Sequence, residues 1–102
     1  MAQEELRTEK RSTTLQKPNE PRRYRVIILN DDFTTFEFVI DVMMGVFYKT
    51  YQEAMEIAET THIHKKATVG IYSYDMARSK VAKAVSLARE EGFPLNFEIE
   101  PE

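Results

Sequence analysis

The stretch RVIILNDDFTTFEFVIDVMMGVF, residues 25–47, limits the possible folds more than any other part of the chain. Its four successive apolar residues at 26–29 predict a well covered β-strand over residues 24–29. The polar run Asn30-Asp31-Asp32 follows directly, and apolar residues then recur at intervals of three and four, as on one face of a helix. A strand must therefore turn into a helix within a few residues. The polar side chains at this junction are either turn formers or a site for a cation.

Two threonine–glutamate pairs predict where helices begin. Thr34 and Glu37 have the spacing of a capping box, with Thr34 as the N-cap of the first helix. Thr50 and Glu53 predict the start of a second helix in the same way. The rest of the pattern predicts a strand over 67–73, a third helix from Ser73 or Asp75 that closes at Gly92 and Pro94, and an alternating strand over 95–100.

The resulting order is β-α-α-β-α-β. Three strands and three helices in about 80 residues predict a small α+β domain, a three-stranded sheet with helices packed on one face. Residues 1–21 hold few large apolar side chains among mixed charges, so we expect a disordered N-terminal tail before a core domain over 22–102. With 102 residues in total, one domain is expected.

Composition narrows the class of protein. The sequence holds no cysteine, which excludes disulfides and thiolate chemistry and is typical of a reducing compartment. Neither a signal-peptide pattern at the start nor an apolar run near the ~18 residues of a membrane span is present, so a soluble, cytoplasmic protein without a membrane partner is expected. The formal net charge of −3 and the small, separate basic clusters argue against nucleic-acid binding.

The sequence gives little support to catalysis or to a cofactor. Adjacent residues of an extended segment point in opposite directions, so Asp31 and Asp32 are poorly placed to act as a catalytic carboxylate pair. The three glycines are scattered and form no phosphate-binding loop. His62 and His64, two apart on a helix, diverge by about 200° and do not suit a shared metal. We therefore expect neither an enzyme, nor a metal site, nor a cofactor.

A ligand site fits the acidic junction better. A turn needs only one residue of this kind, and three in succession leave spare acceptors that suit an ammonium group. Apolar side chains lie within two turns of it on the first helix, and the second helix offers a stripe of residues at spacings of three and four. If the two helices pack antiparallel, the end of the second lies beside the start of the first. These candidate residues are Phe36, Val39, Ala58, Thr61 and His62. Ordinary turn chemistry, and an ordinary half-exposed histidine at 62, remain alternatives.

The sequence resembles the ClpS family over roughly residues 22–100, in one unbroken register. The segments that carry the resemblance are YRVIILNDDFTTFEFVIDVM, THIHKKATVGIYSYDMARSKV and AREEGFPL. The most specific is the run Asn-Asp-Asp-aromatic-Thr-x-x-Glu-Phe-Val. ClpS proteins are non-enzymatic adaptors that select substrates with a bulky apolar N-terminal residue (Phe, Leu, Tyr or Trp) for a Clp AAA+ protease. Their fold is similar to the C-terminal domain of the ribosomal stalk protein.

The resemblance also implies a role for particular residues. The α-amino group of a substrate would be held by Asn30, Asp31 and His62, with Asp32 and Thr34 contacting the peptide backbone. The cavity for the first side chain would be lined by Phe36, Val39, Ala58, Thr61 and Leu95. The N-terminal domain of a ClpA- or ClpC-type unfoldase would dock around Tyr72, Asp75 and Lys80, and the tail would be the arm that the unfoldase engages.

The alternative is a protein–protein docking module of the ribosomal-stalk type, which has no ligand pocket. In that case the polar run is turn chemistry alone, and the exposed face of the third helix does the binding. An acid-lipped hollow between the first two helices distinguishes the two hypotheses.

Overall fold

The computed structural model describes residues 22–102, so the prediction of a disordered tail over 1–21 lies outside the described residues. The elements are strand β2 (Arg23–Leu29), helix α1 (Phe36–Gly45), helix α2 (Tyr51–His64), strand β3 (Lys66–Ser73), helix α3 (Tyr74–Glu90) and strand β4 (Asn96–Pro101). This confirms the predicted order β-α-α-β-α-β and the α+β class.

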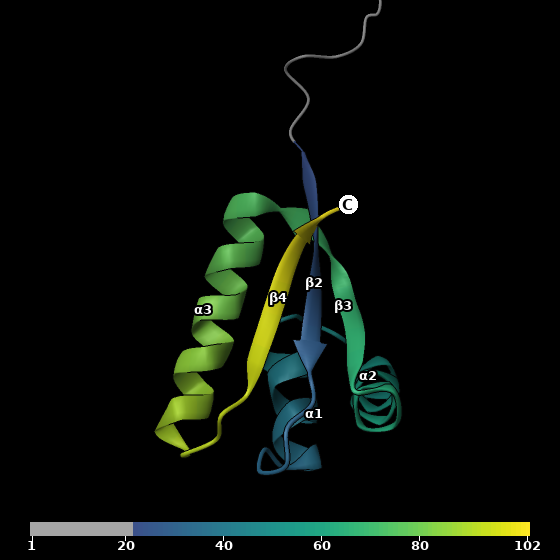
Figure 1. Ribbon diagram of the computed structural model, residues 1–102, viewed down its shortest axis with the longest axis vertical. Coiled ribbons are helices and arrows are strands. Elements are labelled where there is room, and N and C mark those ends of the chain that lie inside the picture. Colours follow the sequence, from purple (N-terminus) through teal and green to yellow (C-terminus); the bar gives the residue numbers. More distant parts are fainter. Residues whose placement is uncertain (1–21) are drawn as a thin grey trace, which may run out of the picture.

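The three strands form one antiparallel sheet in the order β3-β2-β4, with β2 at its centre (Figure 1). Ile28 on β2 lies opposite Ala67 on one neighbour and Phe97 on the other. The pairing of β2 with β3 shifts its register between Val26 and Ile27. The apolar run predicted to be a covered strand is therefore the central strand, whose two edges are both paired.

The hydrophobic core lies between the sheet and the helices. Val26 and Ile28, two apart on β2, are both fully buried in the core cluster, to which α1, α2 and α3 all contribute. The opposite face of β2 carries Ile27 and Arg25, and Arg25 forms an ion pair with Glu100 at 3.0 Å. Helices therefore pack on one face of the sheet, as predicted.

The second and third helices begin where the sequence predicts. The backbone N–H of Thr50 donates to Glu53 Oε1 at 2.9 Å, and Glu53 N–H donates to Thr50 Oγ1 at 3.1 Å, which completes the predicted capping box. Ser73 caps α3 by accepting from the N–H of Met76 at 3.3 Å. Gly92, just beyond α3, has φ +78°, a conformation that favours glycine.

The predicted cap of the first helix is wrong by one residue. Thr35, not Thr34, is the N-cap of α1 and accepts from the N–H of Phe38 at 3.1 Å. Thr34 is instead tied to the preceding turn, because both its N–H and its hydroxyl donate to Asp31. Glu37 consequently occupies the second helical position rather than the third, so it does not complete a capping box.

The two helices next to the acidic junction are not antiparallel. In the view of Figure 1, α1 is seen from the side and α2 nearly end-on beside the lower end of β3, so their axes are steeply inclined to each other. The end of α2 nevertheless lies close to the start of α1, because the backbone N–H of Asn30 donates to the carbonyl of Lys65 at 2.9 Å. Lys65 is the left-handed C-cap of α2, with φ 76°.

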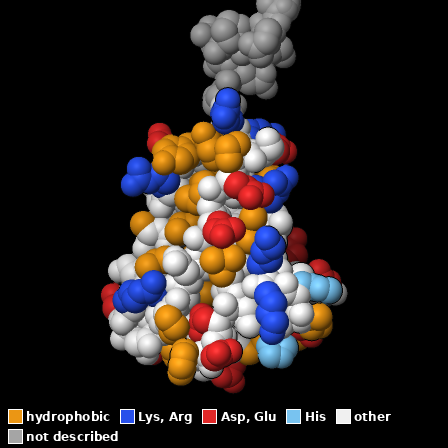
Figure 2. Space-filling model, viewed as in Figure 1, with side chains coloured by type: hydrophobic (Ala, Val, Ile, Leu, Met, Phe, Trp, Pro, Cys, Tyr) orange, Lys and Arg blue, Asp and Glu red, His pale blue; other side chains and the backbone are white. Residues whose placement is uncertain are grey.

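Charges are interspersed on the face where the sheet lies in front of α1 and α2. Figure 2 shows Lys and Arg side chains alternating with Asp and Glu there, rather than gathered in one basic area. None of the helices between residues 22 and 102 combines the length and apolar character that a membrane crossing requires.

Candidate functional site

The loop between β2 and α1 is built around one carboxylate. Asp31 Oδ1 accepts hydrogen bonds from the N–H of Phe33 at 2.8 Å and of Thr34 at 2.7 Å. Asp31 Oδ2 accepts from the Thr34 hydroxyl at 2.7 Å. An aspartate that binds the backbone two and three residues ahead forms a local turn, which explains how the chain reverses from strand to helix in so few residues.

The same contacts determine the charge of Asp31. Burial acts to raise the pKa of its carboxyl, but the hydrogen bonds from Thr34 and Phe33, together with the positive charge of Arg89, outweigh burial and hold the pKa below its ordinary value. Asp31 is therefore ionised at neutral pH. An ionised carboxylate has about four lone-pair sites, so three bonds leave about one for a ligand.

A cavity of about 530 Å³ opens beside this loop. Its wall is made by the loop, the first turns of α1 and the last turns of α2. The lining residues are Asn30, Asp31, Asp32, Thr34, Phe36, Val39, Ala58, Thr61, His62 and Lys65. The structure thus brings together every residue that the sequence predicts for the amine, backbone and apolar subsites, except Leu95. The docking-module alternative has no such hollow.

The inner wall of the cavity is apolar and the rim is polar. Val39 is 7% and Ala58 3% exposed, whereas Asp32 and His62 are exposed. Thr61 is buried, and its hydroxyl donates to the carbonyl of Ile57 at 2.7 Å, so this polar group is satisfied inside α2. The arrangement suits a ligand with a cationic head and an apolar body.

Two residues depart from the prediction. Leu95 is 1% exposed and packs in the core cluster rather than lining the cavity, and its carbonyl accepts from Arg89 Nη1 at 2.9 Å. Lys65 lines the cavity but was not predicted. It comes there because α2 ends in a left-handed residue, a position usually taken by glycine, and no pattern in the sequence indicates that a lysine adopts it.

The proposed docking residues lie in two places. Lys80 Nζ donates to the carbonyl of Val46 at 3.0 Å and lies 5.9 Å from the ring centroid of Tyr72. Burial raises the pKa of the Tyr72 hydroxyl. Asp75 instead lines a separate hollow at the start of α3, which it shares with Arg22.

The acidic rim has no metal-binding geometry among the described residues. Between residues 22 and 102, no three or more His, Asp or Glu side chains come together in a way that holds a metal ion. What the polar groups around the cavity offer a ligand is hydrogen-bond acceptors, hydrogen-bond donors and the negative charge of Asp31.

Comparison with known proteins identifies the family. Residues 19–98 match the family described as ATP-dependent Clp protease adaptor protein ClpS. The chain belongs to the ClpS family. The ClpS adapter protein of Acetivibrio thermocellus is 46% identical over 82 residues, which cover 80% of this chain and 83% of the relative. That of Wolinella succinogenes is 43% identical over 81 residues, 79% of each chain.

A solved ClpS structure has the same fold. Agrobacterium tumefaciens ClpS2, bound to L-phenylalaninamide, is 38% identical and matches with a TM-score of 0.78 over 81% of this chain and 100% of that one. The predicted family is confirmed. This ClpS-family chain is accordingly an adaptor of the ATP-dependent Clp protease and not itself an enzyme.

Proposed function

We propose that the acid-lipped cavity binds the first residue of substrate proteins when that residue has a free α-amino group and a bulky apolar side chain, Phe, Leu, Tyr or Trp. The adaptor then delivers the substrate to a Clp AAA+ unfoldase of the ClpA or ClpC type. The observation that carries this proposal is the joining of an ionised carboxylate rim to a buried apolar wall in one cavity of about 530 Å³. That volume lies within the usual range for ligand sites.

The rim supplies the recognition of the amine. A free α-amino group has a pKa of about 7.7–8.0, so it is largely protonated at neutral pH and offers three donors. Asp31 contributes charge and its remaining acceptor, and Asn30 contributes a side-chain carbonyl beside it. His62 adds a polar group from α2 to the lining of the cavity. A ligand without the amine leaves these acceptors unpaired, which penalises internal sequences and acetylated termini.

The wall supplies the preference for bulky side chains. Burial of a Phe or Leu side chain contributes about 1.5–3 kcal/mol, well short of the roughly 8 kcal/mol that micromolar binding needs. Binding therefore requires the amine contacts as well as Val39 and Ala58. Phe36, 42% exposed at the opening, is placed to cover the side chain of the ligand.

The relative of known structure supports this ligand class. L-phenylalaninamide, bound to Agrobacterium tumefaciens ClpS2, has a free α-amino group, a phenyl side chain and an amide in place of the next peptide bond. It therefore mimics an N-terminal phenylalanine, and the fold of the protein that binds it matches this chain with a TM-score of 0.78.

A peptide pair tests the proposal. A fluorescent peptide that begins with Phe is expected to bind, whereas its N-acetylated twin is not, as measured by fluorescence anisotropy. Asn30→Ala is expected to weaken binding strongly, and Gln52→Ala, which also removes a carboxamide but at an exposed site on α2, is the control. Equal binding of the two peptides, or an unchanged affinity in Asn30→Ala, contradicts the proposed site.

Delivery is tested separately from binding. Removal of residues 1–21 is expected to leave the affinity for the Phe peptide unchanged, because the described residues that line the cavity lie between 30 and 65. Degradation of a Phe-starting substrate by the Clp protease is expected to fail, since the adaptor then lacks the N-terminal arm that the unfoldase engages. Degradation at the full rate by the truncated adaptor contradicts that role for the tail.

A further inference from the structure

A second cavity, of about 410 Å³, lies between α1 and α3 and shares no residue with the acid-lipped cavity. We call it the α1–α3 groove. Its lining residues are Phe38, Asp41, Val42, Gly45, Val46, Lys83, Leu87, Glu90 and Glu91.

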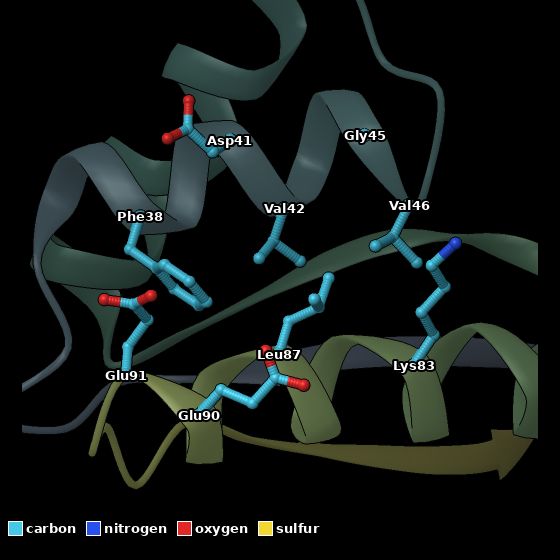
Figure 3. A pocket seen from close by; sticks show the side chains of 9 residues that line it. All are labelled: Phe38, Asp41, Val42, Gly45, Val46, Lys83, Leu87, Glu90 and Glu91. Atoms are coloured by element: carbon cyan, nitrogen blue, oxygen red, sulfur yellow. The ribbon is translucent and has the colours of Figure 1, made fainter.

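The floor of the groove is apolar and has room for a side chain. Figure 3 shows Phe38, Val42 and Val46 pointing from α1 toward α3. Leu87 points back from α3 between them. A Cβ added at Gly45 meets nothing within 4 Å, so this part of the groove is open space.

The groove is acidic at one end. Glu90 and Glu91 lie on the α3 side near Phe38, and Asp41 stands on the α1 side, whereas the cation Lys83 lies at the other end near Val46. Within residues 22–102, the ion pairs are those of Arg23 with Glu102 and of Arg25 with Glu100, so neither uses the carboxylates of the groove. The site therefore suits a segment that carries one apolar side chain next to several cations.

The chain itself contains such a segment. Residues 10–17, KRSTTLQK, hold three cations, no carboxylate and a single large apolar residue, Leu15. We propose that residues 10–17 dock in the α1–α3 groove of the same molecule. Leu15 enters the apolar floor, and Lys10 and Arg11 lie against the acidic end.

The length of chain between the segment and the core allows this placement. Arg22 lies at the start of α3, since it lines one hollow with Asp75. Leu87 is twelve residues along α3 from Asp75, about 18 Å, and the seven residues from Leu15 to Arg22 extend up to about 23 Å. Arg11, eleven residues from Arg22, reaches up to about 36 Å, beyond the end of α3 at about 22 Å. The segment runs down α3 with its cations at the end where the carboxylates lie.

A paramagnetic label on the full chain tests this docking. The sequence has no cysteine, so Ser12→Cys gives a single thiol for a nitroxide label. We expect a selective loss of amide peak intensity in the ¹⁵N-labelled protein at Gly45, Lys83 and Leu87, in comparison with Thr68 on the open face of the sheet. The loss should weaken in high salt, because the pairing of exposed charges is screened.

Charge reversal distinguishes docking in the groove from general attraction. The double variant Glu90→Lys and Glu91→Lys is expected to abolish the selective intensity loss. Glu56→Lys with Glu59→Lys, the same change of charge at exposed sites on α2, is expected to leave it in place. Lys83→Glu, which adds a carboxylate to the groove, is expected to increase it.

The outcomes separate the possible occupants. Intensity loss that is uniform over the surface, or that persists in Glu90→Lys with Glu91→Lys, overturns the proposal. The control mixes ¹⁴N chains that carry the nitroxide with ¹⁵N chains that carry none. Loss of peak intensity at the groove in this mixture shows that the segment of a second copy occupies it, which also overturns intramolecular docking. The test uses no substrate peptide, so its result is independent of the proposed amine recognition.

Discussion

Replacement of Asp31 separates the turn from the recognition of the amine, because Ala and Asn remove different parts of its chemistry. Asp31→Ala removes all three hydrogen bonds that its carboxylate accepts from Phe33 and Thr34. Asp31→Asn keeps a side-chain carbonyl that can accept from both backbone N–H groups, but it removes the negative charge. The two variants therefore share a loss of charge and differ in the turn.

The cost to stability follows from the hydrogen bonds. At roughly 0.5–1.5 kcal/mol net for each bond, Asp31→Ala loses about 1.5–4.5 kcal/mol, and the lower part of this range is expected because the loop is partly solvated. A small domain has about 5–15 kcal/mol in total, so the fold should survive. Each kcal/mol lowers Tm by about 4–8 °C, which circular dichroism resolves easily. Asp31→Asn is expected to lose much less.

The cost to binding follows from the charge. A hydrogen bond to a charged group contributes about 1.5–3 kcal/mol, which corresponds to an affinity about 10- to 100-fold weaker for a Phe-starting peptide. Both Asp31 variants should show this loss in fluorescence anisotropy, whereas Glu56→Gln, which removes an exposed charge from α2, should not. If Asp31→Asn binds the peptide as tightly as the parent chain, Asp31 is a turn former alone and its assignment to the amine is refuted.

Three further predictions concern stability. Thr50→Ala removes the capping box with Glu53 and should cost about 0.5–2 kcal/mol in urea unfolding, and no change would contradict the role of the cap. Gly92→Ala should cost about 1–2 kcal/mol through its φ of +78° alone, since a Cβ there meets nothing within 4 Å, whereas Gly45→Ala on α1 should stabilise by about 0.5–1 kcal/mol. Hydrogen bonds outweigh burial and hold the pKa of Asp31 below its ordinary value of 3.8. The contribution of the ionised carboxylate to folding stability is therefore fully present well above pH 3.8 and is lost as pH falls through the lower pKa of the folded state. The stability difference between the parent and Asp31→Asn should therefore stay constant down to about pH 5 and shrink from there to about pH 2, and a constant difference over the whole range would contradict the hydrogen-bonding account.

Helix starts show where local sequence is sufficient and where it is not. Among residues 22–102, the Thr50 hydroxyl and the Glu53 carboxylate accept each other's backbone N–H groups, so the capping box forms as predicted. At the first helix two threonines are adjacent, and the spacing from Thr34 to Glu37 favoured the wrong one. Thr35 caps the helix because the N–H and the hydroxyl of Thr34 already donate to Asp31.

The residues of the candidate site likewise divide into those that local sequence predicts and those that depend on tertiary packing. Asp31, Phe36 and Val39 were found from sequence because they lie within a few residues of one another, where spacing determines geometry. The inclusion of α2 rested on an antiparallel packing that the structure does not have. Residues of α2 still reach the cavity because the N–H of Asn30 binds the carbonyl of Lys65, a contact between chain segments far apart in sequence.

The amino-acid sequence by itself determined the order of strands and helices, the well covered strand before the acidic turn, and the turn itself, since these depend on period, capping and turn chemistry within a few residues. Only the tertiary structure decided that Leu95 belongs to the core, that Lys65 borders the cavity, and that a groove remains open between α1 and α3. The physical reason is that a cavity is the space left when side chains from separate elements pack. Its shape depends on crossing angles and on the volume of every neighbour, which no local pattern specifies.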